Sequence, residues 1–238
     1  MSNSRLFPQA PGTLLALMLC CLMPHGAVAA APATDARAAN VDLIREQLAE
    51  HIGTLAYVWG YPMVDMATQL HNETHSVAAD QPVVAPLNAF HRREYLVTPT
   101  TAGNLRAPNN DTLYLSGWFD LGKEPVIVHV PDTAGRFYTL AITDFFNEVT
   151  HIGRRTTGTA EGYFALVGPD FAGQLPEGVK SVQVATKQAW ILGRILVDGE
   201  SDFPQALALM RDFWSAPLSQ WRRGERPAEA AVTRGAPM

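Results

Sequence analysis

A run of polar residues, Arg106 to Thr112, stands directly before a stretch of alternating apolar residues that is typical of a strand. Asp111 and Arg106 have the types needed for a catalytic base, because a nearby guanidinium favours the ionised carboxylate. The alternative is a turn, since Asn and Asp tolerate left-handed backbone and bond amides two residues along. The sequence therefore offers Asp111 as a candidate base and Arg106 as the group that fixes its charge, with a structural turn as the alternative.

Two further polar stretches interrupt the strands that follow, at residues 143–147 and 153–158. If consecutive hairpins stack in chain order, the start of the strand after Asp111 and the end of the strand before Asp144 meet at one rim of the sheet. Loops on a rigid sheet often carry binding sites. Arginine and aspartate side chains also tie loops together without binding anything. We expect either a shared small-molecule site at this polar rim or structural ion pairs.

Histidine offers a weaker site. His71 and His75 lie four residues apart on a predicted helix, the spacing at which two imidazoles can share a metal. Glu73 does not directly follow the first histidine, as a zinc protease motif requires, and no third ligand is evident. We predict no metal site and keep the two histidines as weak candidates.

The remaining chemistry-bearing patterns are few. The chain has no Gly-x-Ser-x-Gly elbow, no Ser-x-x-Lys pair and no glycine-rich phosphate loop. The sequence does not identify a cofactor, so the cofactor stays unknown. Aromatic residues fill cores more often than they line ligand pockets, and both alternatives apply to Trp118, Trp190, Trp214, Trp221, Tyr114 and Tyr138.

The elements that must position these residues begin with a helix. Asp42 can cap a helix whose apolar stripe runs from Ile44 to Trp59. Gly60 and Pro62 interrupt it, and a second short helix can start at Pro62.

From about residue 86 the apolar period changes to two, which indicates antiparallel strands in a meander of hairpins. The strands are predicted at residues 113–121, 126–130, 136–143, 163–167, 179–185 and 189–197. A C-terminal helix follows from Asp202, with a stripe that includes Trp214 and Trp221 and a kink at Pro217. We predict a mainly β fold, an immunoglobulin-like antiparallel β-sandwich with an N-terminal helical segment and this C-terminal helix.

The first 29 residues have the features of an export signal: one arginine, an apolar block too short to span a bilayer, and Ala27-Val28-Ala29 before the cleavage point. Both cysteines lie within it. We therefore predict a signal peptide at 1–29, a flexible leader at 30–40, one domain at 41–222 and a disordered tail at 223–238. The net charge of −5 disfavours nucleic acid as a partner. No later segment is apolar enough for stable membrane insertion, so we expect a periplasmic or secreted protein.

Four motifs of the sequence are distinctive: "RAPNNDTLYLSGWFDL", "VPDTAGRFYTLAITD", "RRTTGT" and "WILGRILVDGESDFP". Together they resemble the bacterial envelope family known as domain of unknown function 1254. The resemblance implies the immunoglobulin-like sandwich. Beside Arg106 and Asp111, it points to Asn109, Tyr114, Asp144, Asn147, Arg155 and Arg194 as binding residues. Many relatives continue into a helical segment and a jelly-roll domain, so a companion jelly-roll protein is an expected partner.

Two hypotheses follow. The first is an exported domain that binds or processes a small molecule at the polar rim, by a hydrolase- or lyase-like reaction with Asp111 as base. The second is a non-catalytic interaction module that docks a separately encoded companion domain through the C-terminal helix. Whether the protein is an enzyme stays open at this point.

Overall fold

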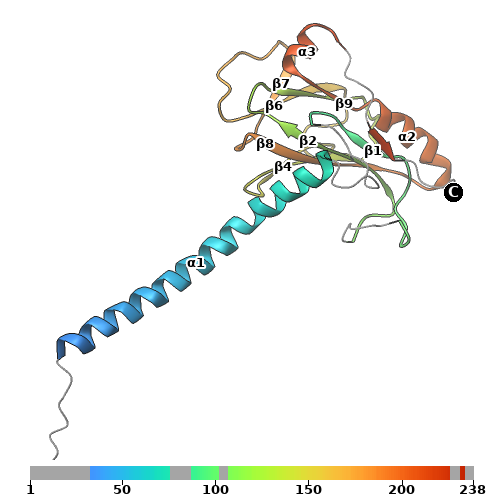
Figure 1. Ribbon diagram of the computed structural model, residues 1–238. Coiled ribbons are helices and arrows are strands. Elements are labelled where there is room, and N and C mark those ends of the chain that lie inside the picture. The colour runs from blue at the N-terminus through green and yellow to red at the C-terminus, as the bar shows by residue number, and fades with distance from the viewer. Residues whose placement is uncertain (1–32, 76–86, 102–106, 226–230, 234–238) are drawn as a thin grey trace, which may run out of the picture. The chain divides into compact units, whose positions relative to one another are not determined.

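A computed structural model describes residues 33–75, 87–101, 107–225 and 231–233 (Figure 1). The predicted signal peptide and Arg106 lie outside the described residues. The chain divides into two units, Met1–Ile52 and Gly53–Met238. Helix α1 (Ala33–Thr74) contributes to both units. No helix within the described ranges combines the length and apolar character needed to cross a bilayer.

The second unit contains two sheets. In the larger, six-stranded sheet the strand order is β10-β1-β2-β8-β4-β5, and in the four-stranded sheet it is β7-β6-β3-β9. The larger sheet comprises β10 (Ala231–Thr233), β1 (His91–Arg93), β2 (Thr112–Asp120), β8 (Gln188–Leu196), β4 (Tyr138–Asp144) and β5 (Val149–Gly153). The smaller sheet comprises β7 (Val179–Gln183), β6 (Gly162–Val167), β3 (Val126–Val130) and β9 (Trp214–Pro217).

The pairings are antiparallel except for β1 with β10 and β6 with β7, which are parallel. The predicted mainly β fold with flanking helices is confirmed, while its immunoglobulin-like detail stays a prediction.

One apolar core joins the two sheets. Leu113 and Leu115 of β2 are fully buried in the same cluster as Val126 and Val128 of β3. Because side chains alternate between the two faces of a strand, every second residue of β2 enters this core. The intervening residues of β2 therefore point to the other face of the larger sheet.

The order of the strands differs from a meander. β2 and β3 follow each other in the chain but belong to different sheets, and β8 lies between β2 and β4. The prediction of consecutive hairpins was wrong because the local alternation that identifies a strand says nothing about its partner. β4 and β5 do pair as consecutive antiparallel strands.

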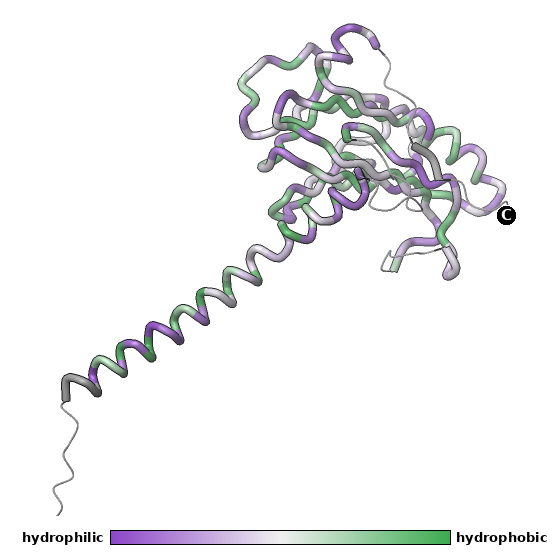
Figure 2. The backbone as a smooth tube through the Cα atoms, in the orientation of Figure 1, coloured by the Kyte–Doolittle hydropathy of each residue, from purple (hydrophilic) through white to green (hydrophobic). Residues whose placement is uncertain are grey.

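Helix α1 is one continuous helix, with Pro62 inside it, rather than two helices separated at Gly60 and Pro62. Its backbone is helical from Ala33, within the segment predicted as a flexible leader. The apolar stripe is exposed, with Leu48 at 55% and Trp59 at 69%. Figure 2 shows hydrophobic residues recurring along α1 between hydrophilic ones. Pro62 removes one backbone donor, and the helix tolerates this loss without ending.

The C-terminal part has a helix, as predicted, but not a single kinked one. The turn η1 (Glu200–Asp202) leads into α2 (Phe203–Arg211), β9 follows, and α3 (Leu218–Arg222) comes last. Residues of the predicted stripe pack within the domain: Met210 is fully buried and Trp214 stacks on His129 at 5.0 Å. His129 of β3 is itself buried, at 8% exposed. Strand β10 lies within the tail predicted to be disordered, where it pairs with β1.

Candidate functional site

The predicted polar rim does not form as expected. β2 and β4 both pair antiparallel with β8, so they run parallel to each other. The start of β2 pairs at Leu196 of β8, whereas Asp144 at the end of β4 pairs at Ala189. Asp111 lies opposite Val197, so at about 3.3 Å per residue Asp111 and Asp144 lie about 26 Å apart along the sheet. The convergence of these two carboxylates was a wrong prediction, because it assumed that the strands stack in chain order.

Asp144 has a local structural role. Its Oδ1 accepts hydrogen bonds from the backbone N–H groups of Phe146 and Glu148, both at 2.9 Å. The N–H of Asn147 donates to the Asp144 carbonyl at 3.0 Å, and Asn147 has a φ of 66°. This is an Asx-type turn, which Asp and Asn commonly form, and it lies here in the β4–β5 hairpin.

A different surface gathers polar and aromatic side chains. We call the face of the larger sheet that points away from the core the outward face. Its residues alternate with core residues along the strands. It comprises Thr112, Tyr114, Ser116 and Trp118 of β2, Trp190, Leu192 and Arg194 of β8, and Thr139, Ala141 and Thr143 of β4.

One row of this face, which we call the Tyr114 end, carries two guanidinium groups. Arg93 of β1 and Arg194 of β8 pair with Tyr114 from either side. The Arg194 guanidinium carbon lies 5.8 Å from the centroid of the Tyr114 ring. The Tyr114 hydroxyl accepts a hydrogen bond from the Asn109 N–H at 2.7 Å, with Tyr114 itself 4% exposed. The strand register thus brings together Asn109, Tyr114 and Arg194, three of the residues indicated by the sequence.

Two buried polar atoms at the Tyr114 end have no hydrogen-bond partner among the described residues. They are the Nε of Arg194 and the Oγ1 of Thr112, whose residue is 3% exposed. A buried donor without an acceptor costs about 1–3 kcal/mol. Unpaired polar atoms of this kind are rare in folded proteins and call for an explanation. A bound acceptor would satisfy them.

The other end of the outward face is aromatic, and we call it the tryptophan end. Trp118 and Trp190 pair across β2 and β8 with their ring centroids 5.9 Å apart, and Phe145 meets Trp118 edge-on at 6.3 Å. The Trp118 Nε1 donates to Oε2 of Glu73, in the last turn of α1, at 2.7 Å. The Nε1 of Trp190 is buried without a hydrogen-bond partner in the described part of the chain.

Burial shifts two titratable groups beside this face. Desolvation raises the pKa of Glu73 above its usual value, against the opposing effects of the Trp118 hydrogen bond and of Arg93. Desolvation, with a further contribution from Arg93, lowers the pKa of His91 to about 4. His91 of β1 pairs with Ser116 in the row beside Tyr114 and is 4% exposed. His91 is therefore uncharged at neutral pH.

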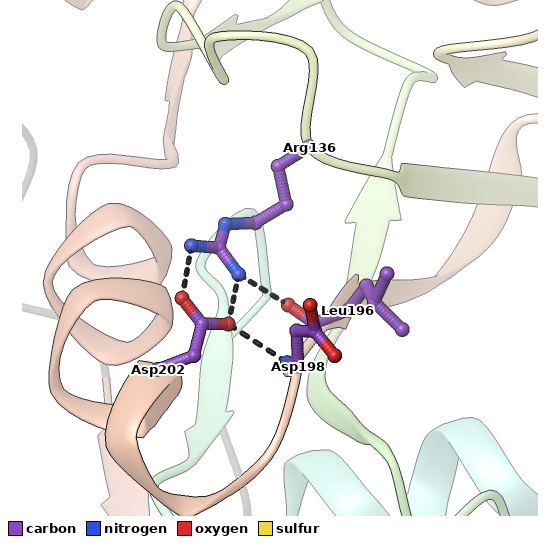
Figure 3. A network of polar contacts seen from close by, with 4 residues as sticks. All are labelled: Arg136, Leu196, Asp198 and Asp202. Atoms are coloured by element: carbon purple, nitrogen blue, oxygen red, sulfur yellow. Dashed lines mark hydrogen bonds and ion pairs between the residues drawn. The ribbon is translucent and has the colours of Figure 1, made fainter.

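An ion-pair network holds the neighbouring strand ends together (Figure 3). Arg136, just before β4, forms an ion pair with Asp202 through both of its terminal nitrogens, and its Nη1 also donates to the Leu196 carbonyl at 2.9 Å. The Asp202 carboxylate accepts the Asp198 N–H at 2.8 Å. Because Leu196 ends β8 two residues after Arg194, this network positions the end of the strand that carries Arg194.

The remaining sequence-predicted residues are scattered. Asp111 precedes β2 and is exposed, and its carbonyl accepts the Val197 N–H at 2.8 Å. Arg155 is exposed and lies 5.3 Å from the ring of Phe137, at the same end of the sheet. Arg106 lies outside the described residues.

The rings of His71 and His75 stack at 4.7 Å, and His75 Nδ1 lies 2.9 Å from the Thr74 hydroxyl. The residues that the structure describes contain no group of three or more His, Cys, Asp or Glu side chains that could hold a metal ion.

Sequence reasoning missed part of this face. Thr112 and Trp190 were noticed as polar and aromatic residues but not assigned to a site. Glu73 was considered only for a metal motif, and Arg93 was not considered. The signal for the strand residues was present, since Thr112, Tyr114, Ser116 and Trp118 alternate with core leucines. The signal for Arg93 was absent, because β1 is only three residues long.

The arrangement favours binding of hydrogen-bond acceptors. The Tyr114 end offers guanidinium and hydroxyl donors, and arginine matches planar oxyanions such as carboxylates with paired hydrogen bonds. The aromatic rings of the tryptophan end pack against one another at the other end of the same face.

Comparison with known proteins gives a family but no activity. A model of the family described as "Protein of unknown function (DUF1254)" matches residues 87–217. No curated protein matches the chain.

Two solved structures resemble the chain. The crystal structure of the VPA0106 protein from Vibrio parahaemolyticus is 31% identical with a TM-score of 0.57, and the match covers 77% of this chain and 41% of that one. The chain therefore spans less than half the length of that structure. An uncharacterized protein from Burkholderia cenocepacia is 10% identical with a TM-score of 0.32, over 46% of this chain and 31% of that one.

Proposed function

Because the chain belongs to the family described as "Protein of unknown function (DUF1254)", whose description assigns no reaction, we propose a function from the geometry of the site. The protein is an exported domain that binds a small oxyanion-bearing molecule at the Tyr114 end of the outward face. This keeps the small-molecule hypothesis and moves its site from the rim to the sheet.

One observation carries the proposal. The row Arg93–Tyr114–Arg194 presents two cations. The buried Thr112 hydroxyl and the Arg194 Nε at this end have no hydrogen-bond partner within the described residues. An internal carboxylate would neutralise Arg194 if the row were purely structural, as Asp202 does for Arg136. No ion pair joins Arg194 to a described carboxylate. A carboxylate or phosphate of a ligand fits this role.

Export is supported by the sequence of residues 1–29, with its single arginine, short apolar block and small residues before the cleavage point. Cleavage of a secreted precursor, measured by mass spectrometry of the mature protein, tests this part. A protein that keeps residues 1–29 after expression in its own host refutes it.

The binding test uses thermal unfolding, because a ligand that binds only the folded state raises Tm. The probes are octanoate, as a carboxylate, and inorganic phosphate. Arg194→Gln removes the guanidinium, and Arg154→Gln is the matched control, since it removes the charge of an exposed arginine that follows β5. We expect at least one probe to stabilise the wild type and Arg154→Gln but not Arg194→Gln. Equal shifts in both variants contradict the proposal.

Catalysis by Asp111 stays a prediction within this function. Asp111 is exposed next to Thr112, so it lies at the same end of the sheet as a ligand held at the Tyr114 end. Asp111→Asn separates binding from reaction: loss of turnover with an unchanged ligand-induced Tm shift supports a base, whereas an unchanged rate excludes it.

The companion-domain hypothesis gains no support from the C-terminal segment. It depended on a free stripe ending in Trp214 and Trp221, but Trp214 stacks on His129 and Trp221 packs 6.0 Å from Tyr163. These contacts use the apolar surface that a partner would need.

A further inference from the structure

Two of the unpartnered donors belong to the same strand. Trp190 and Arg194 are four residues apart on β8 and share the outward face. At about 3.3 Å per residue their Cα atoms lie about 13 Å apart. In the described part of the chain, neither the Nε1 of Trp190 nor the Nε of Arg194 has a hydrogen-bond acceptor. A single small anion such as acetate does not reach both.

The residues between the two donors are small or apolar. The middle row of the outward face holds Leu192 of β8, with Ser116 of β2 and Ala141 of β4 as its neighbours. All three are partly buried rather than fully covered. They offer apolar contact along the line from Arg194 to Trp190, and no charged side chain from β2, β8 or β4 interrupts that row.

The two ends differ in charge. Arg194 is a cation, and a second cation, Arg93, lies on the other side of Tyr114. Trp190 offers one uncharged N–H. Its stacked neighbour Trp118 already donates to the carboxyl group of Glu73. A second ligand carboxylate at Trp190 would be buried with a single hydrogen bond and close to that carboxyl group, an unfavourable arrangement. A neutral acceptor avoids this cost.

We propose that the ligand of the outward face is an elongated molecule with a carboxylate at Arg194, an apolar middle over Leu192, and a neutral carbonyl or amide oxygen at Trp190 Nε1. This inference rests on the proposed function, since it assumes that Arg194 holds an oxyanion. It adds the length of the ligand and the chemistry of its second end.

Isothermal titration of the mature protein tests the inference with three probes of equal length. Octanoate has only the carboxylate, the monoamide of suberic acid adds a neutral acceptor, and suberate adds a second carboxylate. We expect the monoamide to bind the wild type about tenfold more tightly than octanoate, the gain of one added hydrogen bond. Suberate should bind no more tightly than octanoate. Monoamides of adipic and sebacic acid then locate the length at which the gain is largest.

Trp190→Phe is the matched variant, because it keeps an aromatic ring and removes the N–H. The advantage of the monoamide over octanoate, measured as the ratio of their Kd values within each protein, should disappear in Trp190→Phe. If this variant does not fold, the wild-type series of lengths still decides the question. An advantage that is absent at all lengths, or that persists in Trp190→Phe, overturns the inference.

The outcomes separate the two proposals. If octanoate binds and depends on Arg194, but the monoamide gains nothing, the proposed function stands and the second acceptor is refuted. If no carboxylate probe binds the wild type, this inference fails, and the proposed function fails with it when phosphate does not bind either. If suberate binds as tightly as the monoamide, the neutral character of the second end is wrong. Our argument expects Glu73→Gln to bind suberate more tightly than the wild type does. Unchanged suberate binding in this variant would contradict it.

Discussion

Asp202→Asn tests the ion pair that joins the start of β4 to the end of β8. The Arg136 side chain meets the Asp202 carboxylate through both terminal nitrogens, and the two side chains are 18% and 16% exposed. The hydrogen bonds from Arg136 and from the Asp198 N–H lower the pKa of Asp202 from 3.8 to about 2. Asparagine keeps the shape of the side chain and loses its charge.

The pKa difference sets the magnitude. Each unit corresponds to about 1.4 kcal/mol of differential stabilisation. The full shift would contribute about 2.5 kcal/mol, and screening by solvent at this surface position reduces it. We expect Asp202→Asn to lower the free energy of unfolding by about 1–2 kcal/mol at pH 7.

The pH dependence has a definite sign. The folded pKa lies below the unfolded value, so the contribution is fully present above about pH 4 and is lost as the pH falls towards 2. Urea unfolding followed by tryptophan fluorescence measures wild type and variant from pH 7 downwards. The difference between them should stay constant to about pH 4 and shrink below it.

The exposed pair of Lys187 and Asp170 is the control, with side chains 56% and 64% exposed. Asp170→Asn should leave stability unchanged, because pairs of this kind contribute little. An Asp202→Asn variant that behaves like Asp170→Asn, or a loss that persists unchanged below pH 3, refutes the reasoning.

Three further changes have defined outcomes. Burial raises the pKa of Glu73, so ionisation of this carboxyl group opposes folding as the pH rises above 4.5. Glu73→Gln keeps an acceptor for the Trp118 indole N–H and should gain in stability relative to wild type between pH 4.5 and 7. Urea unfolding measures this gain. The pKa of His91 falls to about 4, so the wild type should lose stability as the pH falls from 6.5 towards 4, and His91→Gln should lack this slope. Gly193→Ala would place a Cβ 2.8 Å from Leu140 Cδ2 and should lower the free energy of unfolding by about 1–3 kcal/mol. As the control, the Cβ of Gly53→Ala in α1 meets nothing within 4 Å, and this variant should be neutral or stabilising by up to about 1 kcal/mol. The urea midpoints of the two variants measure the difference.

The strands could be predicted from the sequence, but their arrangement could not. Val126–Val130 was predicted with its observed bounds, and five further strands were found within a few residues. Alternation is a local property, which is why it survives in a single sequence. The position of β8 between β2 and β4 depends on contacts between residues at least forty-five positions apart, which no local pattern contains.

The candidate site was predicted in part. The resemblance pointed to Asn109, Tyr114 and Arg194, and the fold brings these three together. It also pointed to Asp144 and Asn147, which serve a hairpin turn at the other end of the sheet. Turn residues and ligand-binding residues have the same polar types, so their sequence pattern does not separate the two roles.

The central place of β8 also affects how the chain is made. On their facing edges, both β2 and β4 form main-chain hydrogen bonds with a strand that is synthesised about fifty to seventy-five residues later. Until β8 emerges from the ribosome, the facing edges of β2 and β4 stay open to other chains, and contacts of such long range slow folding. Nascent or truncated forms that end before residue 188 should therefore associate through these edges and depend on chaperones.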